Sequence, residues 1–228
     1  MRGKIIVIEG TDCSGKETQS KELIRKLNDK AVYFSFPCYD SPTGKIIGGP
    51  YLGKKHICDG WFEETAPLVD PKVSSLYYAA DRRYNIHKIN ELLDQGINVI
   101  LDRYFYSNMA HQGGKIEDKE KRLDMYKWIE KLEVELLDLP IPDIKIFLYV
   151  PYEVSLEIRK NRSEAMDQNE SDKKHLINAL NSYLEVADLY DFKKIDCTID
   201  DKMRTVSDIN DEIYSYVIDR LNNKTFHI

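Results

Sequence analysis

The residues best suited to chemistry lie close to the N-terminus. An apolar run from Ile5 to Ile8 leads into the segment Gly10-Thr11-Asp12-Cys13-Ser14-Gly15-Lys16, which Glu17 and Thr18 follow. Glycines at both ends of such a turn let backbone N–H groups converge on an anion, and the N-terminus of a following helix adds to the attraction. A lysine at the position of Lys16 reaches the outer phosphates of a nucleoside triphosphate. The segment therefore predicts a phosphate-binding loop, although an ordinary β-to-α turn is the alternative.

A second polar group follows another apolar run. Asp102 and Arg103 come directly after residues 97–101, so we expect them at the same edge of a parallel sheet as the phosphate loop. P-loop ATPases of the motor and AAA types usually carry an acidic residue here to activate water. In this chain an arginine takes that place, and a guanidinium is better suited to gripping a second phosphate with two hydrogen bonds. A simple ion pair at the strand end is the alternative.

Apolar patterns predict the elements that position these residues. Continuous apolar runs at residues 31–36, 97–101, 144–150 and, more weakly, 194–199 join the first run as buried parallel strands. Helical periodicity covers residues 16–28, 74–93, 123–139 and 204–221. This alternation predicts an α/β fold with a doubly wound sheet and ligands at the carboxyl ends of the strands.

Three stretches lack such patterns. Residues 41–70 are rich in glycine and proline, and they form either a loop packed over a site or an irregular connection. Residues 159–174 are polar and charged, as at a solvated helix end. Residues 113–121 indicate a charged loop to which we assign no chemistry.

The composition is that of one globular domain. The chain has 228 residues, of which 42% are apolar and 32% charged, and its formal net charge of -6 offers no footprint for a nucleic-acid backbone. Its four cysteines are scattered, and we expect a reduced, cytoplasmic protein without a signal peptide. The five histidines lack the spacing of a zinc site, and no apolar run approaches the roughly 18 residues of a membrane span, so we expect no membrane partner.

Several blocks together resemble a known family. The phosphate loop is followed by Phe36-Pro37, Thr43-Gly44-Lys45-Ile46, Tyr77-Tyr78-Ala79-Ala80-Asp81-Arg82, and Asp102-Arg103-Tyr104 with Ser107, Ala110 and Gln112-Gly113. In their order and spacing, from residue 4 to about 162, the chain resembles thymidylate kinase. The resemblance implies a P-loop kinase fold over residues 1–228, with a five-stranded parallel sheet flanked by helices and a lid segment at about 159–174. It also implies a homodimer that converts ATP and dTMP into ADP and dTDP with Mg²⁺.

The resemblance assigns roles to individual residues. Arg103 would clamp the dTMP phosphate, and Asp102 would hold magnesium through water or orient that clamp. Tyr78 would stack on thymine, Arg82 would bond its exocyclic oxygen, and Asn108 would lie beside the base edge.

The implied catalytic group is Lys16, Asp102, Arg103, Arg159 and Arg162. The ATP phosphates would be bound by Gly10, Thr11, Asp12, Cys13, Ser14, Gly15, Lys16, Glu17 and Thr18. The dTMP contacts would be Asp12, at the 3′-hydroxyl, with Phe36, Pro37, Tyr78, Arg82, Arg103, Asn108, His111 and Gln112. Without the resemblance, Tyr78 would be interpreted as a core aromatic and Arg82 as a surface partner of Asp81.

Some positions depart from the family pattern. The phosphate loop contains no arginine, so a lid would supply that cation, and Arg159 and Arg162 are the candidates. His111 replaces the usual Phe or Tyr beside the 2′ position of the sugar, and Cys38-Tyr39 replace an acidic-Arg pair. Glu17 stands where a Ser or Thr normally ligates magnesium, which makes Glu17 itself a candidate metal ligand.

The implied reaction needs no strong general base, because its acceptor is already an anionic phosphate oxygen. Catalysis should therefore rest on positioning, charge neutralisation and exclusion of water. The alternatives are a kinase for another nucleotide such as dUMP, or a catalytically weak nucleotide-binding module. A P-loop ATPase or GTPase is disfavoured by Asp102-Arg103 and by the absence of an Asn-Lys-x-Asp guanine motif from the sequence.

Overall fold

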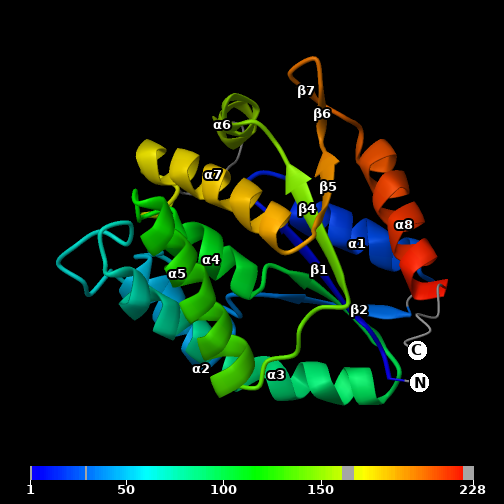
Figure 1. Ribbon diagram of the computed structural model, residues 1–228, viewed down its shortest axis with the longest axis horizontal. Helices are drawn as coiled ribbons and strands as arrows, with labels where there is room; N and C mark the ends of the chain where they lie inside the picture. Colours follow the sequence, from blue (N-terminus) through cyan, green and yellow to red (C-terminus); the bar gives the residue numbers. More distant parts are fainter. Residues whose placement is uncertain (1, 29, 161–166, 223–228) are drawn as a thin grey trace.

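The apolar runs of the sequence form one five-stranded parallel sheet in the computed structural model, which describes residues 2–28, 30–160 and 167–222. Its strands are β1 (Ile5–Gly10), β2 (Ala31–Ser35), β3 (Asn98–Asp102), β4 (Ile144–Tyr149) and β5 (Lys193–Asp196). They lie in the spatial order β2-β3-β1-β4-β5, with β1 paired to β3 on one side and to β4 on the other. The predicted five-stranded parallel α/β sheet is confirmed (Figure 1).

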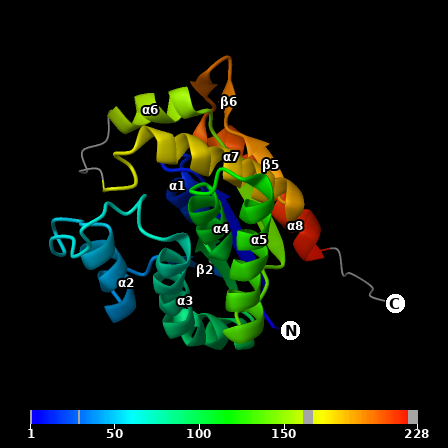
Figure 2. The same cartoon turned by 60° about the vertical axis from the view of Figure 1, so that its left-hand side comes forward.

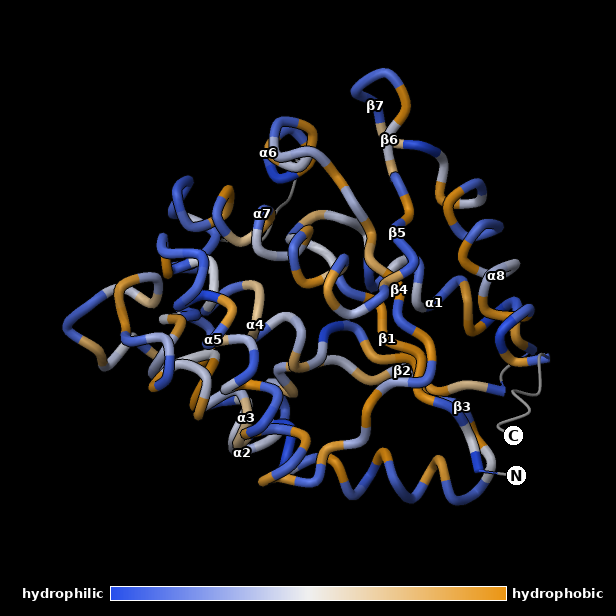
Figure 3. Tube along the Cα trace, in the orientation of Figure 1, coloured by the Kyte–Doolittle hydropathy of each residue, from blue (hydrophilic) through white to orange (hydrophobic). Residues whose placement is uncertain are grey.

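Helices cover both faces of this sheet, because its strands are apolar on both sides. The α-helices are α1 (Lys16–Lys26), α2 (Pro42–Ile46), α3 (Pro71–Asp94), α4 (Phe105–Gly113), α5 (Lys119–Glu130), α6 (Tyr152–Lys160), α7 (Lys173–Leu189) and α8 (Val206–Asn222). Ile5 and Val7 of β1 pack with α3, α4 and α5, whereas Ile6 and Ile8 pack with α1 and α8. In Figure 3 the hydrophobic colour is concentrated along the central strands of the sheet.

The boundaries of several predicted helices differ from the observed ones. The predicted helix at 123–139 starts earlier, at Lys119, and ends in a π-helical segment, η2 (Lys131–Leu136). The charged loop predicted at 113–121 is correspondingly shorter, because Gly113 closes α4 and α5 begins at Lys119. The predicted strand at 194–199 ends at Asp196, after which the chain forms a small antiparallel hairpin of β6 (Thr198–Ile199) and β7 (Lys202–Met203).

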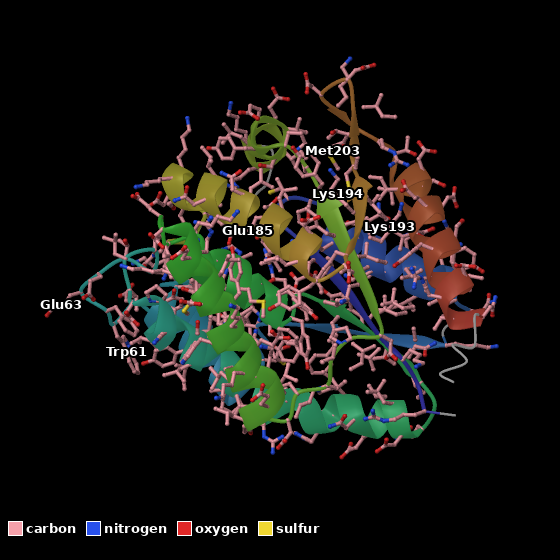
Figure 4. The ribbon with its side chains drawn as sticks, viewed as in Figure 1. Trp61, Glu63, Glu185, Lys193, Lys194 and Met203 are labelled. Atoms are coloured by element: carbon pink, nitrogen blue, oxygen red, sulfur yellow. The ribbon has the colours of Figure 1, made fainter. Side chains whose placement is uncertain are left out.

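The segment at residues 41–70 contains more regular structure than the loop or the irregular connection that the sequence indicated. It contains α2, a π-helical segment η1 (Ile47–Tyr51) and a small apolar cluster of its own, formed by Ile47, Tyr51, Leu52, Ala66 and Val69. Figure 2 shows it beside α3. Trp61 and Glu63 lie at its outer end, and the Trp61 side chain is 76% exposed (Figure 4).

In the described part of the chain, no helix is both long and apolar enough to cross a membrane.

Candidate active site

The carboxyl ends of β1, β2 and β3 open into one cavity of about 650 Å³. Its walls also include α3, α4 and the turn at residues 167–170. The cavity brings together most of the predicted site residues: Asp12, Cys13, Gly15, Lys16, Glu17, Thr18, Phe36, Pro37, Tyr78, Arg82, Asp102, Arg103, Asn108, His111 and Gln112. Gly10, Thr11 and Ser14 lie in the same loop, behind its lining. Two separate sequence predictions, the phosphate loop and the acceptor residues, thus meet in a single space.

The phosphate loop is shaped by its glycines. A Cβ on Gly10 would lie 2.6 Å from Ser14 Oγ and 2.8 Å from the Leu148 carbonyl oxygen, and Gly15 has a φ of +81°, which disfavours any other residue. The Lys16 ammonium donates to the Thr11 carbonyl at 2.7 Å, and Ser14 Oγ is buried without a hydrogen-bond partner among the described residues. Burial and the nearby Arg103 lower the pKa of Lys16. The loop therefore places an ammonium in the cavity where an anion would bind.

Arg103 lies between this loop and the rest of the cavity. Its guanidinium pairs with Asp12 through Nη2, and its Nη1 donates to the Tyr183 hydroxyl at 2.8 Å and to the Gly10 carbonyl at 3.3 Å. Burial tends to raise the pKa of Asp12, but Arg103 and Lys16 lower it further than burial raises it. The carboxylate predicted at the sugar 3′-hydroxyl is therefore also the ion-pair partner of the clamp.

Glu9, which sequence reasoning missed, fixes the turn that carries Arg103. Arg103 has a φ of +67°, an unfavourable backbone conformation for a residue with a side chain. Glu9 Oε1 accepts from the backbone N–H of Tyr104 at 2.8 Å and of Ser107 at 3.1 Å, so it caps α4 directly after this turn. Its Oε2 accepts from the hydroxyls of Ser107 and Tyr183. Burial raises the pKa of Glu9, while these contacts and Arg103 oppose the shift.

The carboxylates predicted to serve a metal differ in their surroundings. Asp102 is 8% exposed, lines the cavity and accepts from the Tyr33 hydroxyl at 3.1 Å. The Glu17 side chain is 63% exposed and pairs with Lys21 at 2.6 Å. No group of three or more His, Cys, Asp or Glu side chains in the described residues could hold a metal by itself. Asp102 is thus a buried carboxylate in the cavity that also contains the phosphate loop, and Mg²⁺ usually binds to substrate phosphates, water and one or two carboxylates.

Arg82 and Asn108 line the far end of the cavity. Both contact Glu133, a residue that the sequence analysis did not single out. Arg82 is 2% exposed and makes a two-pronged ion pair with Glu133 of η2, so the interpretation as a surface partner of Asp81 is wrong. Asp81 instead accepts from the Cys38 backbone N–H at 2.8 Å, which holds the chain after β2. Burial tends to lower the pKa of Arg82, but the Glu133 charge raises it, so the guanidinium stays protonated.

Two further predicted dTMP contacts lie on α4. The Nδ1 atom of His111 is 3.1 Å from Nε2 of His175, and the two rings stack with centroids 5.3 Å apart. Burial is the main cause that lowers the pKa of both imidazoles, and that of His175 falls to about 4. Gln112 Oε1 is buried without a partner among the described residues. His111 and Gln112 are thus polar and uncharged near pH 7.

The predicted lid is described in part. Arg159 lies in α6 and is 8% exposed, with Nη1 donating to the Glu170 carbonyl at 3.4 Å, whereas Arg162 lies outside the described residues. The turn at 167–170 contacts the 41–70 segment, because Asp167 pairs with Lys54 at 3.3 Å and Gln168 accepts from the Ala66 backbone N–H at 2.7 Å. Figure 2 shows this turn, in yellow, above the cyan segment. It therefore closes one side of the cavity.

A parallel sheet with a phosphate loop after its first strand, and an Asp-Arg pair after the neighbouring strand, defines a P-loop nucleoside monophosphate kinase. The family model described as thymidylate kinase matches residues 8–213, and the chain belongs to the thymidylate kinase family.

Individual relatives agree with this assignment. The chain is 33% identical to the thymidylate kinase of Prochlorococcus marinus (strain NATL2A), over 93% of this chain and 97% of the other. It is 33% identical to the Schizosaccharomyces pombe thymidylate kinase, over 78% and 75% of the two chains. Among solved structures, the thymidylate kinase of Candida albicans superposes with a TM-score of 0.76 at 26% identity, covering 97% of this chain and 93% of the other. The family, fold and enzyme class predicted from the sequence are confirmed.

Proposed function

We propose that this kinase transfers the γ-phosphoryl group of ATP to dTMP, giving ADP and dTDP. The observation that carries the proposal is the continuity of the cavity. It joins the phosphate loop to the Arg82 and Asn108 end, and Arg103 stands between them. An ATP phosphate chain on the loop and a nucleoside monophosphate in the remaining space would bring their phosphates together at Arg103. The membership in the thymidylate kinase family supports thymine as the base.

In this proposal, the chain's residues act through position and charge. Lys16 and the loop N–H groups bind the outer ATP phosphates, while Arg103 holds the dTMP phosphate with two hydrogen bonds. The acceptor oxygen is already anionic, so no side chain has to remove a proton. Arg159 and Arg162 would add positive charge to the migrating group when the lid closes over it, and closure would exclude water.

The site can bind Mg²⁺ together with the ATP phosphates. Asp102 would hold it through water, and Glu17 would contribute only after leaving Lys21. When bound, the ion would neutralise charge on the β- and γ-phosphates.

We also propose that the protein is a cytoplasmic homodimer. Val73, Leu76 and Tyr84 form an apolar stripe along α3, spaced three and eight residues apart, and their side chains are 40%, 51% and 49% exposed. A second copy of the chain would bury this stripe. Leu76→Glu should convert the dimer into a monomer in light scattering, while Leu136→Glu, at an exposed residue outside the stripe, should leave it dimeric.

The experiment that tests the reaction is ADP release with a panel of acceptors. We expect ADP to be released much faster from ATP in the presence of dTMP than from ATP alone, and dTDP to form as the second product. Preference for dUMP or another nucleotide would support the alternative substrate. ATP affinity without turnover on any acceptor would support a catalytically weak binding module.

A further inference from the structure

The base-reading end of the cavity depends on one buried carboxylate. Glu133 is fully buried, belongs to η2 and is not among the residues that line the cavity. Its Oε2 accepts from Arg82 Nε, and its Oε1 accepts from Arg82 Nη2 and, at 3.0 Å, from Asn108 Nδ2. One side chain therefore contacts both residues that we place beside the base.

This contact fixes which way the Asn108 amide points. Asn108 Nδ2 faces two acceptors, Glu133 Oε1 at 3.0 Å and the Ser75 carbonyl oxygen at 3.4 Å. An amide oxygen in that position would face both acceptors without a proton, so only the NH₂ group fits there. Asn108 Oδ1 is then the remaining polar atom. It is buried and has no hydrogen-bond partner among the described residues, and Asn108 lines the cavity.

The same contact limits what Arg82 can offer. Glu133 occupies the Nε–H and one N–H of Nη2, so the N–H groups of Nη1 and the second one of Nη2 are left to donate, and Arg82 lines the cavity. The cavity lining thus presents an acceptor, Asn108 Oδ1, beside a donor, the Arg82 guanidinium, and Gln112 Oε1 is a second acceptor without a partner among the described residues. Thymine and uracil complement this pair, because they have an N–H at position 3 and a carbonyl oxygen at position 4. Cytosine has a bare nitrogen and an amino group at those positions, so it would place acceptor against acceptor and donor against donor.

We propose that Glu133 is a specificity-positioning residue, which sets the hydrogen-bond polarity of Asn108 and Arg82 so that the site accepts 4-oxo pyrimidines and rejects cytosine. The inference rests on the proposed function, since it takes the base to lie at this end of the cavity. Glu133 does not touch the substrate itself and acts through the two side chains that do.

Glu133→Gln tests the proposal, because it keeps the shape of the side chain but replaces one oxygen by an NH₂ group. Three donors face the carboxylate, so that NH₂ group must face at least one of them. In the place of Oε1 the NH₂ group faces Asn108 Nδ2, and rotation of the Asn108 amide would then turn Nδ2 toward the cavity. In the place of Oε2 it faces Arg82 Nε and breaks one of the two contacts that hold the guanidinium, so either placement disturbs one of the two groups that read the base. We expect the ratio of kcat/KM for dTMP to that for dCMP to fall by about tenfold or more, with the KM for ATP within about threefold of wild type.

The matched control is Glu185→Gln, which also removes a carboxylate that holds an arginine by two contacts. Glu185 pairs with Arg122 at 2.8 Å and lies on α7, outside the cavity lining (Figure 4). It should leave the dTMP to dCMP ratio unchanged. A folded Glu133→Gln protein whose ratio stays within about threefold of wild type would overturn the proposal.

A second measurement uses the wild-type protein, in case Glu133→Gln does not fold. N3-methylated dTMP lacks the N–H that Asn108 Oδ1 would accept, and it should react with a kcat/KM at least about tenfold lower than that of dTMP. Equal turnover of the two nucleotides would show that no acceptor reads position 3, which overturns the proposal. If wild type does not phosphorylate dTMP at all, the proposed function itself fails, and this outcome is distinct from both of the others.

Discussion

Removing the Tyr183 hydroxyl tests how Arg103, the proposed phosphate clamp, is held in place. That hydroxyl accepts from Arg103 Nη1 at 2.8 Å, lies 2.7 Å from Ser107 Oγ, and donates to Glu9 Oε2 at 3.3 Å. Tyr183→Phe keeps the ring, which stacks on Phe147 with centroids 5.6 Å apart, and removes only these contacts. The variant therefore changes the support of the guanidinium without opening a cavity.

The size of the effect follows from the contacts that remain. A hydrogen bond to a charged group contributes about 1.5–3 kcal/mol, which corresponds to about 10- to 150-fold in rate if it is lost entirely from the transition state. Arg103 keeps its Asp12 ion pair and the Gly10 carbonyl, so we expect the lower end, about tenfold in kcat. Stability should fall by about 1–2 kcal/mol, because Glu9 and Ser107 lose a partner.

The assay compares kcat at saturating ATP and dTMP with the free energy of unfolding from denaturant titration. Tyr126→Phe is the matched control, since its hydroxyl also bonds to a serine and a glutamate, Ser182 and Glu185, but outside the cavity. It should lose similar stability and keep its turnover within about twofold. If Tyr183→Phe loses stability but keeps kcat within about threefold, the reasoning that ties Tyr183 to the clamp is wrong.

Four other perturbations probe the account. Arg103→Ala should lower turnover on dTMP by at least about 100-fold, because it removes a charged clamp contributing about 3 kcal/mol, and near-normal dTDP formation would contradict that role. Arg82→Ala should raise the KM for dTMP more than that for ATP, and equal effects on both KM values would indicate a structural role. The same change should lower the free energy of unfolding by about 3–5 kcal/mol, because it removes the ion-pair partner of Glu133 in the core. The double change Arg159→Ala and Arg162→Ala should cut single-turnover transfer by roughly 10³-fold with far less effect on ATP affinity, and a loss within about threefold would exclude a lid cation here. Burial lowers the pKa of His175 to about 4, whereas the unfolded chain takes up this proton near pH 6.5, so stability should fall as the pH drops from about 6.5 to about 4. Between pH 7 and 5 wild type should lose about 2 kcal/mol more than His175→Gln in denaturant titrations, and equal losses would refute the assignment.

The sheet was predictable because its signal is local. Strands β1 to β4 are short, largely apolar runs, and Ile5, Ile6, Val7 and Ile8 are all buried since helices cover both faces. Strand β5 (Lys193–Asp196) has a single buried apolar residue, Ile195, which is why its signal was weaker and its predicted end was wrong. The order of polar residues after β1 and β3 then placed Asp12 and Arg103 at one edge, where the structure pairs them.

Helix α4 was not predicted, because its nine residues are fewer than the window over which a helical period can be recognised. It is surrounded by other elements, so apolar residues such as Phe105 and Met109 and polar ones such as Asn108 and Gln112 are all buried. The 41–70 segment escaped prediction for another reason. Its order depends on contacts with distant residues, such as the hydrogen bond from Ala66 to Gln168.

The contacts of the buried carboxylate Glu133 could not be predicted from the sequence either. Glu133 continues the buried face of α5, since Tyr126 and Ile129 precede it at helical spacing, and an acidic residue on an apolar face is a signal that the sequence does contain. Its partners did not follow from that signal. They lie on α3 and α4, and only the tertiary fold brings Arg82 and Asn108 to it.

The most direct test of the central claim is the fate of the γ-phosphoryl group. Purified protein would be incubated with γ-labelled ATP and Mg²⁺, with and without dTMP, and the label followed in dTDP and in inorganic phosphate. We expect equal amounts of ATP consumed and labelled dTDP formed, with ATP consumption at least about 100-fold slower when dTMP is omitted. Consumption at the same rate without dTMP, with the label released as inorganic phosphate, would contradict that claim.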